Sequence, residues 1–181
     1  MTERPTIERA GLDQIKQELL DAALLRGDFL LSSGARSDYY LDKYRFETRP
    51  ALLRSLGERL AELVPDGVDR LAGTELGAVA LAAAVSLQTG LPFVIVRKVE
   101  KDYSTAKLIE GELLAGETVL VLEDVITTGA QSIKAADRVV AAGAVVVGIL
   151  AVVDRQEGGE ARIVEAGYTL TSLFTRADLG I

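Results

Sequence analysis

Apolar residues recur every three or four positions in the first half of the chain, which is the spacing of an amphipathic helix. The stripe over residues 12–24 predicts a helix that ends before Gly27. A second stripe covers 52–64, and the Ala-rich segment 78–88 predicts a third helix that ends before Gly90. The N-terminal half is therefore expected to be mainly helical.

Short runs rich in β-branched and aliphatic residues predict five strands, at 70–73, 93–96, 119–122, 144–153 and 168–173. The run 119–122 is apolar at every position, as in a central parallel strand covered by helices on both faces. The helix that follows it, with Ile133, Ala136, Val139 and Val140 facing inward, returns the chain to 144–153 and completes a β-α-β unit.

Two such units in sequence predict an α/β fold with a doubly wound, open and mainly parallel sheet. Residues 32–47 and 98–116 show no clear period and are interpreted as insertions. No internal repeat or linker divides the chain, so we expect a single domain over residues 1–181.

The amino-acid composition limits the catalytic and metal-binding groups that the chain can use. The 181 residues are 49% apolar and 26% charged, an ordinary mixture for one globular domain. The chain has no Cys and no His, which excludes disulfides, thiolate nucleophiles, His- or Cys-ligated zinc sites and triads that depend on imidazole. Any catalysis must use carboxylates, lysines, arginines, hydroxyls and backbone amides.

The net charge of −7 argues against non-specific binding of nucleic acid, which rests on clustered cations. The longest apolar run, 141–153, is broken by two glycines and is shorter than the roughly 18 residues that a membrane span needs. Charged residues near the start, among them Glu3 and Arg4, disfavour a signal peptide. We expect a cytoplasmic protein with neither nucleic acid nor membrane as a partner.

The residues after the central strand predict a ligand site. Open parallel sheets bind ligands beyond the carboxyl ends of their strands, and here Glu123 and Asp124 lead into a hydroxyl-rich turn and a helix. Such a turn directs backbone N–H groups and the positive helix end at one point, which suits a monophosphate. The two carboxylates suit ribose hydroxyls or a metal-bound water. The alternative is that Asp124, Thr127 and Ser132 only cap the turn and helix.

The segment 119–131, Val-Leu-Val-Leu-Glu-Asp-Val-Ile-Thr-Thr-Gly-Ala-Gln, closely resembles the phosphoribosyl pyrophosphate (PRPP) signature of type I phosphoribosyltransferases. In that family the acids bind the ribose 2- and 3-hydroxyls and the loop binds the 5-phosphate. The absence of GK[ST], and of GxGxxG after any strand, disfavours nucleotide hydrolysis and dinucleotide binding. The resemblance implies PRPP contacts from Glu123, Asp124, Thr127, Thr128, Gly129, Ala130, Gln131 and Ser132.

Four cations gather in an otherwise acidic chain at Arg97, Lys98, Lys101 and Lys107. A pyrophosphate leaving group needs such charges, although an isolated basic run is more often a solvated hairpin. The pattern RKxxK followed by KLIEG resembles the mobile catalytic loop of orotate phosphoribosyltransferases. The resemblance implies that Arg97, Lys98 and Lys101 bind PRPP, and that Lys101 and Lys107 act in catalysis with Asp124.

Three further segments resemble the same family. In 154–158, Arg155 matches the residue that pairs with the orotate carboxylate, for which a planar guanidinium is apt; alone it would more often be a surface ion-pair partner. The segment 33–42 is similar to the hood motif, which would place Tyr40 over the base together with Thr127; the alternative is a turn with packing tyrosines. Residues 73–77 resemble a pyrophosphate-contacting loop.

The resemblance implies transfer of the phosphoribosyl group of PRPP to orotate, with Mg2+ bound mainly through PRPP and reaching Glu123 or Asp124 only through water. It also implies an N-terminal helix and hood over 1–48, a mobile loop over 98–116 and a homodimer that shares this loop. The chain lacks the loop His of some relatives and has Ser104 and Ala106 where many have glycine. A phosphoribosyltransferase for uracil, xanthine or adenine, a non-catalytic PRPP-binding regulator and a chance match remain the alternatives.

Overall fold

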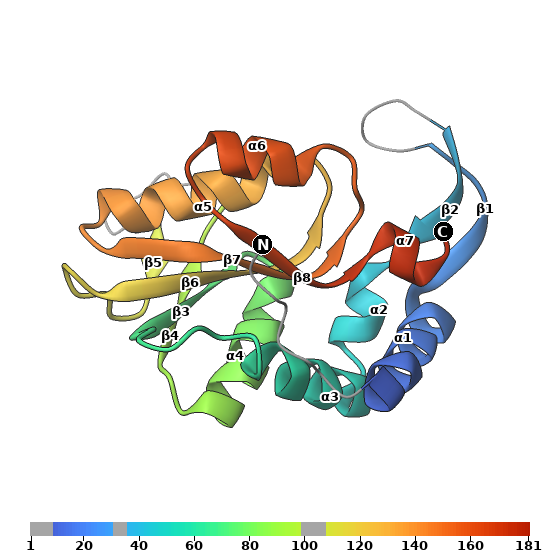
Figure 1. Cartoon of the computed structure of the whole chain (residues 1–181), viewed down its shortest axis with the longest axis horizontal. Coiled ribbons are helices and arrows are strands. Elements are labelled where there is room, and N and C mark those ends of the chain that lie inside the picture. The colour runs from blue at the N-terminus through green and yellow to red at the C-terminus, as the bar shows by residue number, and fades with distance from the viewer. Residues whose placement is uncertain (1–8, 31–35, 99–107) are drawn as a thin grey trace.

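A six-stranded sheet forms the centre of the molecule (Figure 1). The computed structural model describes residues 9–30, 36–98 and 108–181. The strand order is β5-β4-β3-β6-β7-β8, in which only β5 is antiparallel to its neighbour. The strands are β3 (Arg70–Thr74), β4 (Phe93–Val96), β5 (Ile109–Glu110), β6 (Thr118–Ile126), β7 (Val145–Asp154) and β8 (Leu170–Thr175). The predicted open, mainly parallel sheet is confirmed.

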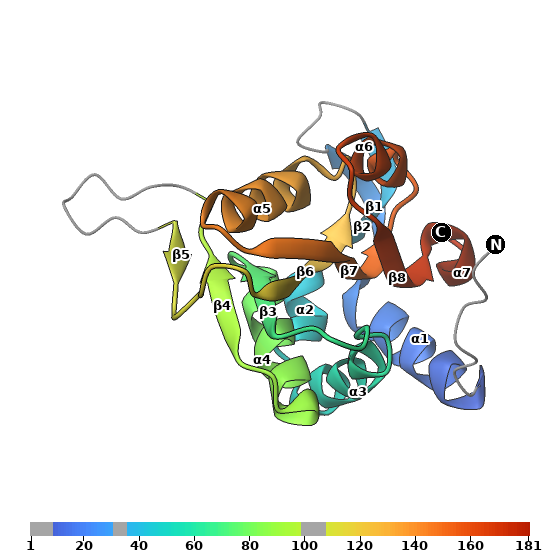
Figure 2. The ribbon, with the colours of Figure 1, turned by 60° about the vertical axis from the view of Figure 1, so that its left-hand side comes forward.

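Helices cover both faces of this sheet (Figures 1 and 2). One face carries α1 (Arg9–Ala23), α3 (Pro50–Ala61) and α4 (Gly77–Thr89), and the other carries α5 (Ala130–Ala141) and α6 (Gly159–Glu165). Two short helices, α2 (Lys43–Glu47) and α7 (Arg176–Leu179), lie near the ends of the strands. None of the helices in the described part of the chain has the length and apolar content needed to cross a membrane.

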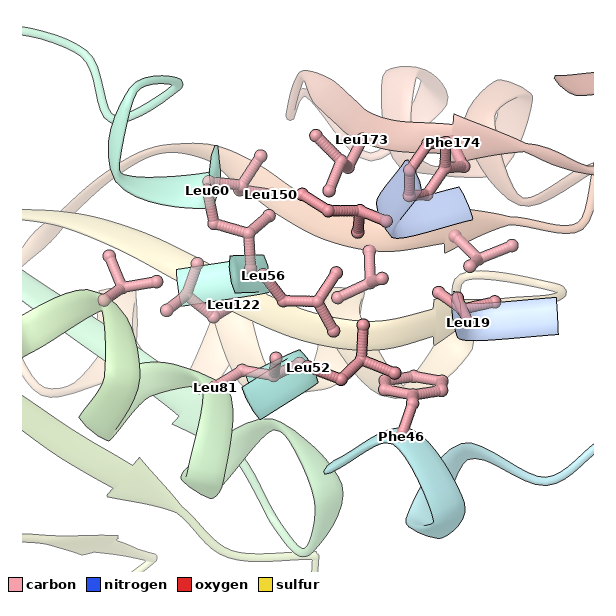
Figure 3. Close-up of a cluster of buried hydrophobic side chains, with 14 of the residues drawn as sticks. Leu19, Phe46, Leu52, Leu56, Leu60, Leu81, Leu122, Leu150, Leu173 and Phe174 are labelled. Atoms are coloured by element: carbon pink, nitrogen blue, oxygen red, sulfur yellow. The ribbon is translucent and has the colours of Figure 1, made fainter. Parts of the chain in front are cut away.

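The central strand β6 shows why the sheet is sandwiched. Leu120 and Leu122 belong to the hydrophobic cluster on the α1, α3 and α4 side, part of which Figure 3 shows. Val119 and Val121 belong to the cluster beneath α5 and α6. Successive strand residues point to opposite faces, so an apolar run buries side chains on both, each worth about 1.5–3 kcal/mol.

The first insertion contains regular structure that its sequence pattern did not predict. Leu24 is the first residue of β1 (Leu24–Leu30) rather than the last of α1, and β1 pairs antiparallel with β2 (Arg36–Leu41). The short helix α2 then follows, held by Phe46, whose side chain is fully buried in the cluster of Figure 3. The residues of this two-stranded ribbon are almost all exposed or half-buried, so they give too weak an apolar pattern to be recognised in the sequence.

In the second half of the chain, the structure differs from the sequence prediction in two further respects. Val140 was expected to face inward, but it is 47% exposed, because the buried face of α5 ends in Val139 in this last turn and Val140 points about 100° away from it. The helices α6 and α7 were not predicted, since seven and four residues are too few for a clear periodicity. The three predicted helices of the first half, the helix after β6 and the five predicted strands are all present, with ends that differ by a few residues.

Candidate active site

A pocket of about 360 Å³ opens at the carboxyl end of β6, where the strand passes through the turn 127–129 into α5. Most of the predicted site residues line it, although they come from segments far apart in the sequence. Its lining consists of Tyr40, Leu41, Lys43, Lys98, Glu123, Asp124, Val125, Ile126, Thr127, Thr128, Gly129, Ala130, Gln131, Ser132 and Arg155.

Glu123 is buried and held by donors from two other elements. Its Oε1 accepts hydrogen bonds from Thr74 Oγ1 at 2.8 Å and from the Asp124 amide at 3.2 Å, while Oε2 accepts one from Ser132 Oγ at 2.9 Å. Burial and the neighbouring charge of Asp124 raise the pKa of Glu123 to about 7, against the lowering effect of these hydrogen bonds. The Thr74 hydroxyl is thus a hydrogen-bond donor to the Glu123 carboxylate, a role that the sequence did not indicate.

Asp124 is only 1% exposed, and protein donors also reach both of its oxygens. Oδ1 accepts from the Val125 amide at 2.6 Å, and Oδ2 accepts from Lys43 Nζ at 2.6 Å. Burial is the largest single effect on Lys43 and lowers its pKa, but the charge and hydrogen bond of Asp124, together with the charges of Glu123 and Glu47, outweigh burial and raise the pKa overall, so the lysine stays charged. Lys43 is a site residue that the sequence analysis missed.

A third carboxyl group, that of Glu47, completes this cluster. Glu47 is 4% exposed, and a Cβ atom added to Gly77 would collide with Asp124 Oδ2 and with both Glu47 oxygens, so all three lie against this glycine. Burial first, and then the charge and hydrogen bond of Asp124, raise the pKa of Glu47 to about 8. The Lys43–Glu47 spacing of four residues on one helix was the signal available in the sequence.

The turn into α5 is shaped by close packing of α6. Gly129 has φ of 74° and precedes the first residue of α5. A side chain there would approach the carbonyl oxygen of Gly159 to 3.0 Å, and one on Gly159 would approach that of Thr127 to 2.6 Å. The two glycines therefore allow the turn to present Thr127, Thr128 and the amino end of α5 to the pocket, where the helix dipole favours an anion.

Arg155, which follows β7, also lines the pocket. Its Nη2 lies 2.7 Å from Glu157 Oε1, its guanidinium is 5.6 Å from the centre of the Tyr39 ring, and its Nε has no hydrogen-bond partner among the described residues. Tyr40, the predicted cover for the base, is 42% exposed on the pocket rim and contacts Phe29. Tyr39, which orients the arginine, was not singled out in the sequence.

The base of the predicted lysine loop is anchored. Glu75 Oε2 accepts from the Lys98 amide at 2.9 Å, and Arg138 of α5 donates to the carbonyl oxygens of Arg97 and Lys98. The side chain of Arg97 bonds Glu110 at 3.3 Å and does not line the pocket, so its PRPP contact stays a prediction. Lys101, Ser104, Ala106 and Lys107 lie outside the described residues, and the roles predicted for the two lysines also stay predictions.

Among the residues described, no cluster of three or more His, Cys, Asp or Glu side chains is arranged to hold a metal ion. Glu123 and Asp124 are hard oxygen donors of the kind that suits hydrated Mg2+. Since protein hydrogen bonds already occupy part of both carboxylates, they fit contact through a bound water better than direct coordination.

Residues 46–166 match the family model of the phosphoribosyl transferase domain. The orotate phosphoribosyltransferase of Methanocella arvoryzae is 48% identical over 153 residues, which are 84% of this chain and 87% of the relative. That of Natronomonas pharaonis is 47% identical over 168 residues, 90% of this chain and 96% of the relative.

Among solved structures, the orotate phosphoribosyltransferase of Mycobacterium tuberculosis in complex with PRPP superimposes with a TM-score of 0.81 at 32% identity, covering 94% of this chain and 99% of that one. The fold and the site therefore define a phosphoribosyltransferase. Within that class, the chain belongs to the orotate phosphoribosyltransferase family.

Proposed function

We propose that this enzyme transfers the phosphoribosyl group of PRPP to orotate, giving orotidine 5'-monophosphate and pyrophosphate, a step of pyrimidine biosynthesis. The observation that carries the proposal is the joint presence, in one pocket, of Glu123 and Asp124, the anion-binding turn 127–129 and Arg155. These groups match three parts of the two substrates: the ribose hydroxyls, the 5-phosphate and an acidic base.

The carboxylate oxygens retain capacity for the ribose. An ionised carboxylate has about four lone-pair positions. Glu123 Oε1 receives two protein donors, whereas Glu123 Oε2 and Asp124 Oδ1 receive one each. The remaining position on each of these last two oxygens can accept a ribose hydroxyl, while the turn and the amino end of α5 bind the 5-phosphate.

The reaction breaks the bond between the anomeric carbon and pyrophosphate, whose oxygen keeps the electron pair. Orotate N1, as its anion, gives a lone pair to the opposite face of the same carbon, with inversion. The transition state resembles an oxocarbenium ion, so the buried negative charge of Asp124 stabilises it, and Lys98 with Lys101 and Lys107 is proposed to meet the charge on the leaving group. No strong general base is required, which suits a chain without His.

Arg155 supplies the selectivity for an acidic base. Its planar guanidinium can bind a carboxylate through two parallel hydrogen bonds, and Tyr39 holds its plane. Uracil and adenine have no carboxylate for this half-buried guanidinium to bind. Tyr40 and Thr127 are proposed to contact the base from the pocket rim and from the turn.

Mg2+ is proposed as the cofactor, brought in with PRPP, and when bound it would offset part of the pyrophosphate charge. A homodimer that shares its lysine loop, and a cytoplasmic location, are proposed on the resemblance to the family. Sedimentation of the purified protein tests the dimer.

The base specificity is tested by incubating the protein with PRPP, Mg2+ and orotate, uracil, xanthine or adenine in turn, and separating the nucleotides formed. We expect a nucleotide with orotate alone. Product with another base and none with orotate would reassign the enzyme, and PRPP binding without product from any base would identify a regulator.

A further inference from the structure

Lys43 and Glu47 both approach the Asp124 carboxyl group from one short helix: Lys43 donates to Oδ2, and the Glu47 carboxyl lies with Oδ2 against Gly77. They are four residues apart on α2, one helical turn, so both side chains lie on one face of it. Phe46 lies between these two residues in the sequence, and its fully buried side chain packs this helix against the core (Figure 3). The backbone of α2 is thereby set at the wall of the pocket, although its side chains were not part of the predicted site.

The contacts of the two Asp124 oxygens differ. Oδ2 receives Lys43 Nζ at 2.6 Å and lies with the Glu47 carboxyl against Gly77. Among the residues that the structure describes, Oδ1 receives one donor, the Val125 amide at 2.6 Å. Each carboxylate oxygen accepts about two hydrogen bonds, so a donor from the neighbouring Glu47 carboxyl would complete Oδ2 beside Lys43, and the open position would then be on Oδ1.

Glu47 can take the second acceptor position of Asp124 Oδ2 only as a donor, because an ionised carboxylate only accepts hydrogen bonds. Its Oε1 is buried and has no hydrogen-bond partner among the described residues as long as both carboxyls are counted as acceptors. Three buried acids, Glu47, Glu123 and Asp124, surround Lys43 in the described part of the chain, and ionising all of them together would be costly in a buried site. A neutral Glu47 that donates to Asp124 satisfies both buried oxygens.

We propose that Glu47 and Lys43 are positioning residues, which hold Asp124 Oδ2 between a neutral carboxyl donor and an ammonium group so that Oδ1 faces the ribose hydroxyls of PRPP. The inference rests on the proposed function, and it adds the two residues that determine how the ribose-binding carboxylate is oriented. Neither residue is required to touch PRPP or orotate.

The test compares steady-state kinetics of Glu47→Met and Glu47→Gln in the full-length protein. Glu47→Met keeps the side-chain length but removes the donor, and we expect KM for PRPP to rise about tenfold, as for loss of one hydrogen bond, with KM for orotate unchanged. Glu47→Gln keeps a neutral donor and should stay close to the parent. Glu58→Met, at an exposed position of α3, is the matched control.

A purely structural role for Glu47 would lower the unfolding midpoint in both variants without separating the two KM values, and this result would overturn the proposal. Lys43→Met provides a second route if Glu47→Met does not fold, because Lys43 is 27% exposed and its loss leaves the core intact. We expect a rise in KM for PRPP similar to that of Glu47→Met, against no change for the exposed Lys134→Met.

An unchanged KM for PRPP in Lys43→Met would also overturn the proposal. A failure of the proposed function can be told apart from a failure of the positioning role. If the proposed function is wrong, the parent protein itself forms no orotidine 5'-monophosphate. A parent that turns over normally, together with variants that match it, refutes only the positioning role.

Discussion

The hydroxyl of Thr74, at the end of β3, donates to Glu123 Oε1 on β6 at 2.8 Å. This bond joins the segment predicted to contact pyrophosphate to the carboxylate predicted to contact ribose. Two motifs separated by about fifty residues, which the sequence presents as independent, therefore share one buried hydrogen-bond network with Ser132.

Replacing Thr74 with Val keeps the β-branched shape and removes this donor. We expect a loss of about 2 kcal/mol in the free energy of unfolding, because a buried carboxylate loses a partner, and a higher KM for PRPP. Urea unfolding and steady-state kinetics measure the two effects. Thr171→Val, at an exposed position of β8, should change stability by less than about 0.5 kcal/mol. Equal stability of parent and Thr74→Val would contradict the network.

Gly77→Ala should damage the site although alanine is normally the better helix residue. The added methyl group would collide with Asp124 Oδ2 and Glu47, so we expect a destabilisation of about 1–3 kcal/mol and weaker PRPP binding. Gly11→Ala on α1, where the methyl meets only the flexible end of Arg59, is the control and should be close to neutral. Calorimetric titration with PRPP that gave the parental affinity for Gly77→Ala would count against the arrangement.

Arg155 is expected to determine orotate binding. Arg155→Met should raise KM for orotate by about 100-fold, and Arg155→Lys should not restore it, since an ammonium group cannot form two parallel hydrogen bonds with a carboxylate. PRPP affinity should stay close to parental, as it should for the exposed Arg162→Met on α6. A variant of Arg155 with a lower affinity for PRPP and an unchanged KM for orotate would contradict this role.

Far from the pocket, Arg70 and Glu117 form a two-bond ion pair, with Nε and Nη2 each 2.7 Å from a carboxylate oxygen. The hydrogen bonds from Arg70, together with one from the Leu114 amide, lower the pKa of Glu117 below its ordinary 4.5. Since the folded-state pKa is the lower one, this pair stabilises the protein above about pH 4.5 and the stabilisation is lost as the pH falls through the folded-state pKa.

Glu117→Gln should therefore cost about 3 kcal/mol at neutral pH by leaving Arg70, which is 7% exposed, without its charged partner. The difference from the parent, followed by urea unfolding, should shrink as the solution is acidified below the ordinary pKa. If the difference in the free energy of unfolding between the parent and Glu117→Gln grew on acidification, the ion pair would not be its cause.

The sequence allowed the sheet, its order of helices and strands, and most of the pocket lining to be predicted. The reason is that these features leave local signals: the apolar run of β6 is continuous, and Glu123 to Ser132 are contiguous in one motif. Arg155 could be included because the end of a parallel strand next to β6 must lie at the same edge of the sheet.

The contacts made by α2 could not be predicted in this way. A five-residue helix has no measurable period, and nothing local shows that Lys43 and Glu47 meet Asp124, some eighty residues further along. The partners of Thr74 and Tyr39 depend likewise on how distant segments pack together. The inward orientation predicted for Val140 was wrong because Val139 and Val140 point about 100° apart on the helix, and their apolar character alone did not show that Val139 is the buried one.

In the proposed reaction, the phosphoribosyl group of PRPP is transferred to orotate in this pocket. The most direct measurement mixes the parent protein with PRPP, Mg2+ and orotate and follows the absorbance of orotate, with the product identified by chromatography. We expect a loss of absorbance that requires PRPP and yields orotidine 5'-monophosphate. An absorbance that stays constant while PRPP binds to the protein would contradict the proposed reaction.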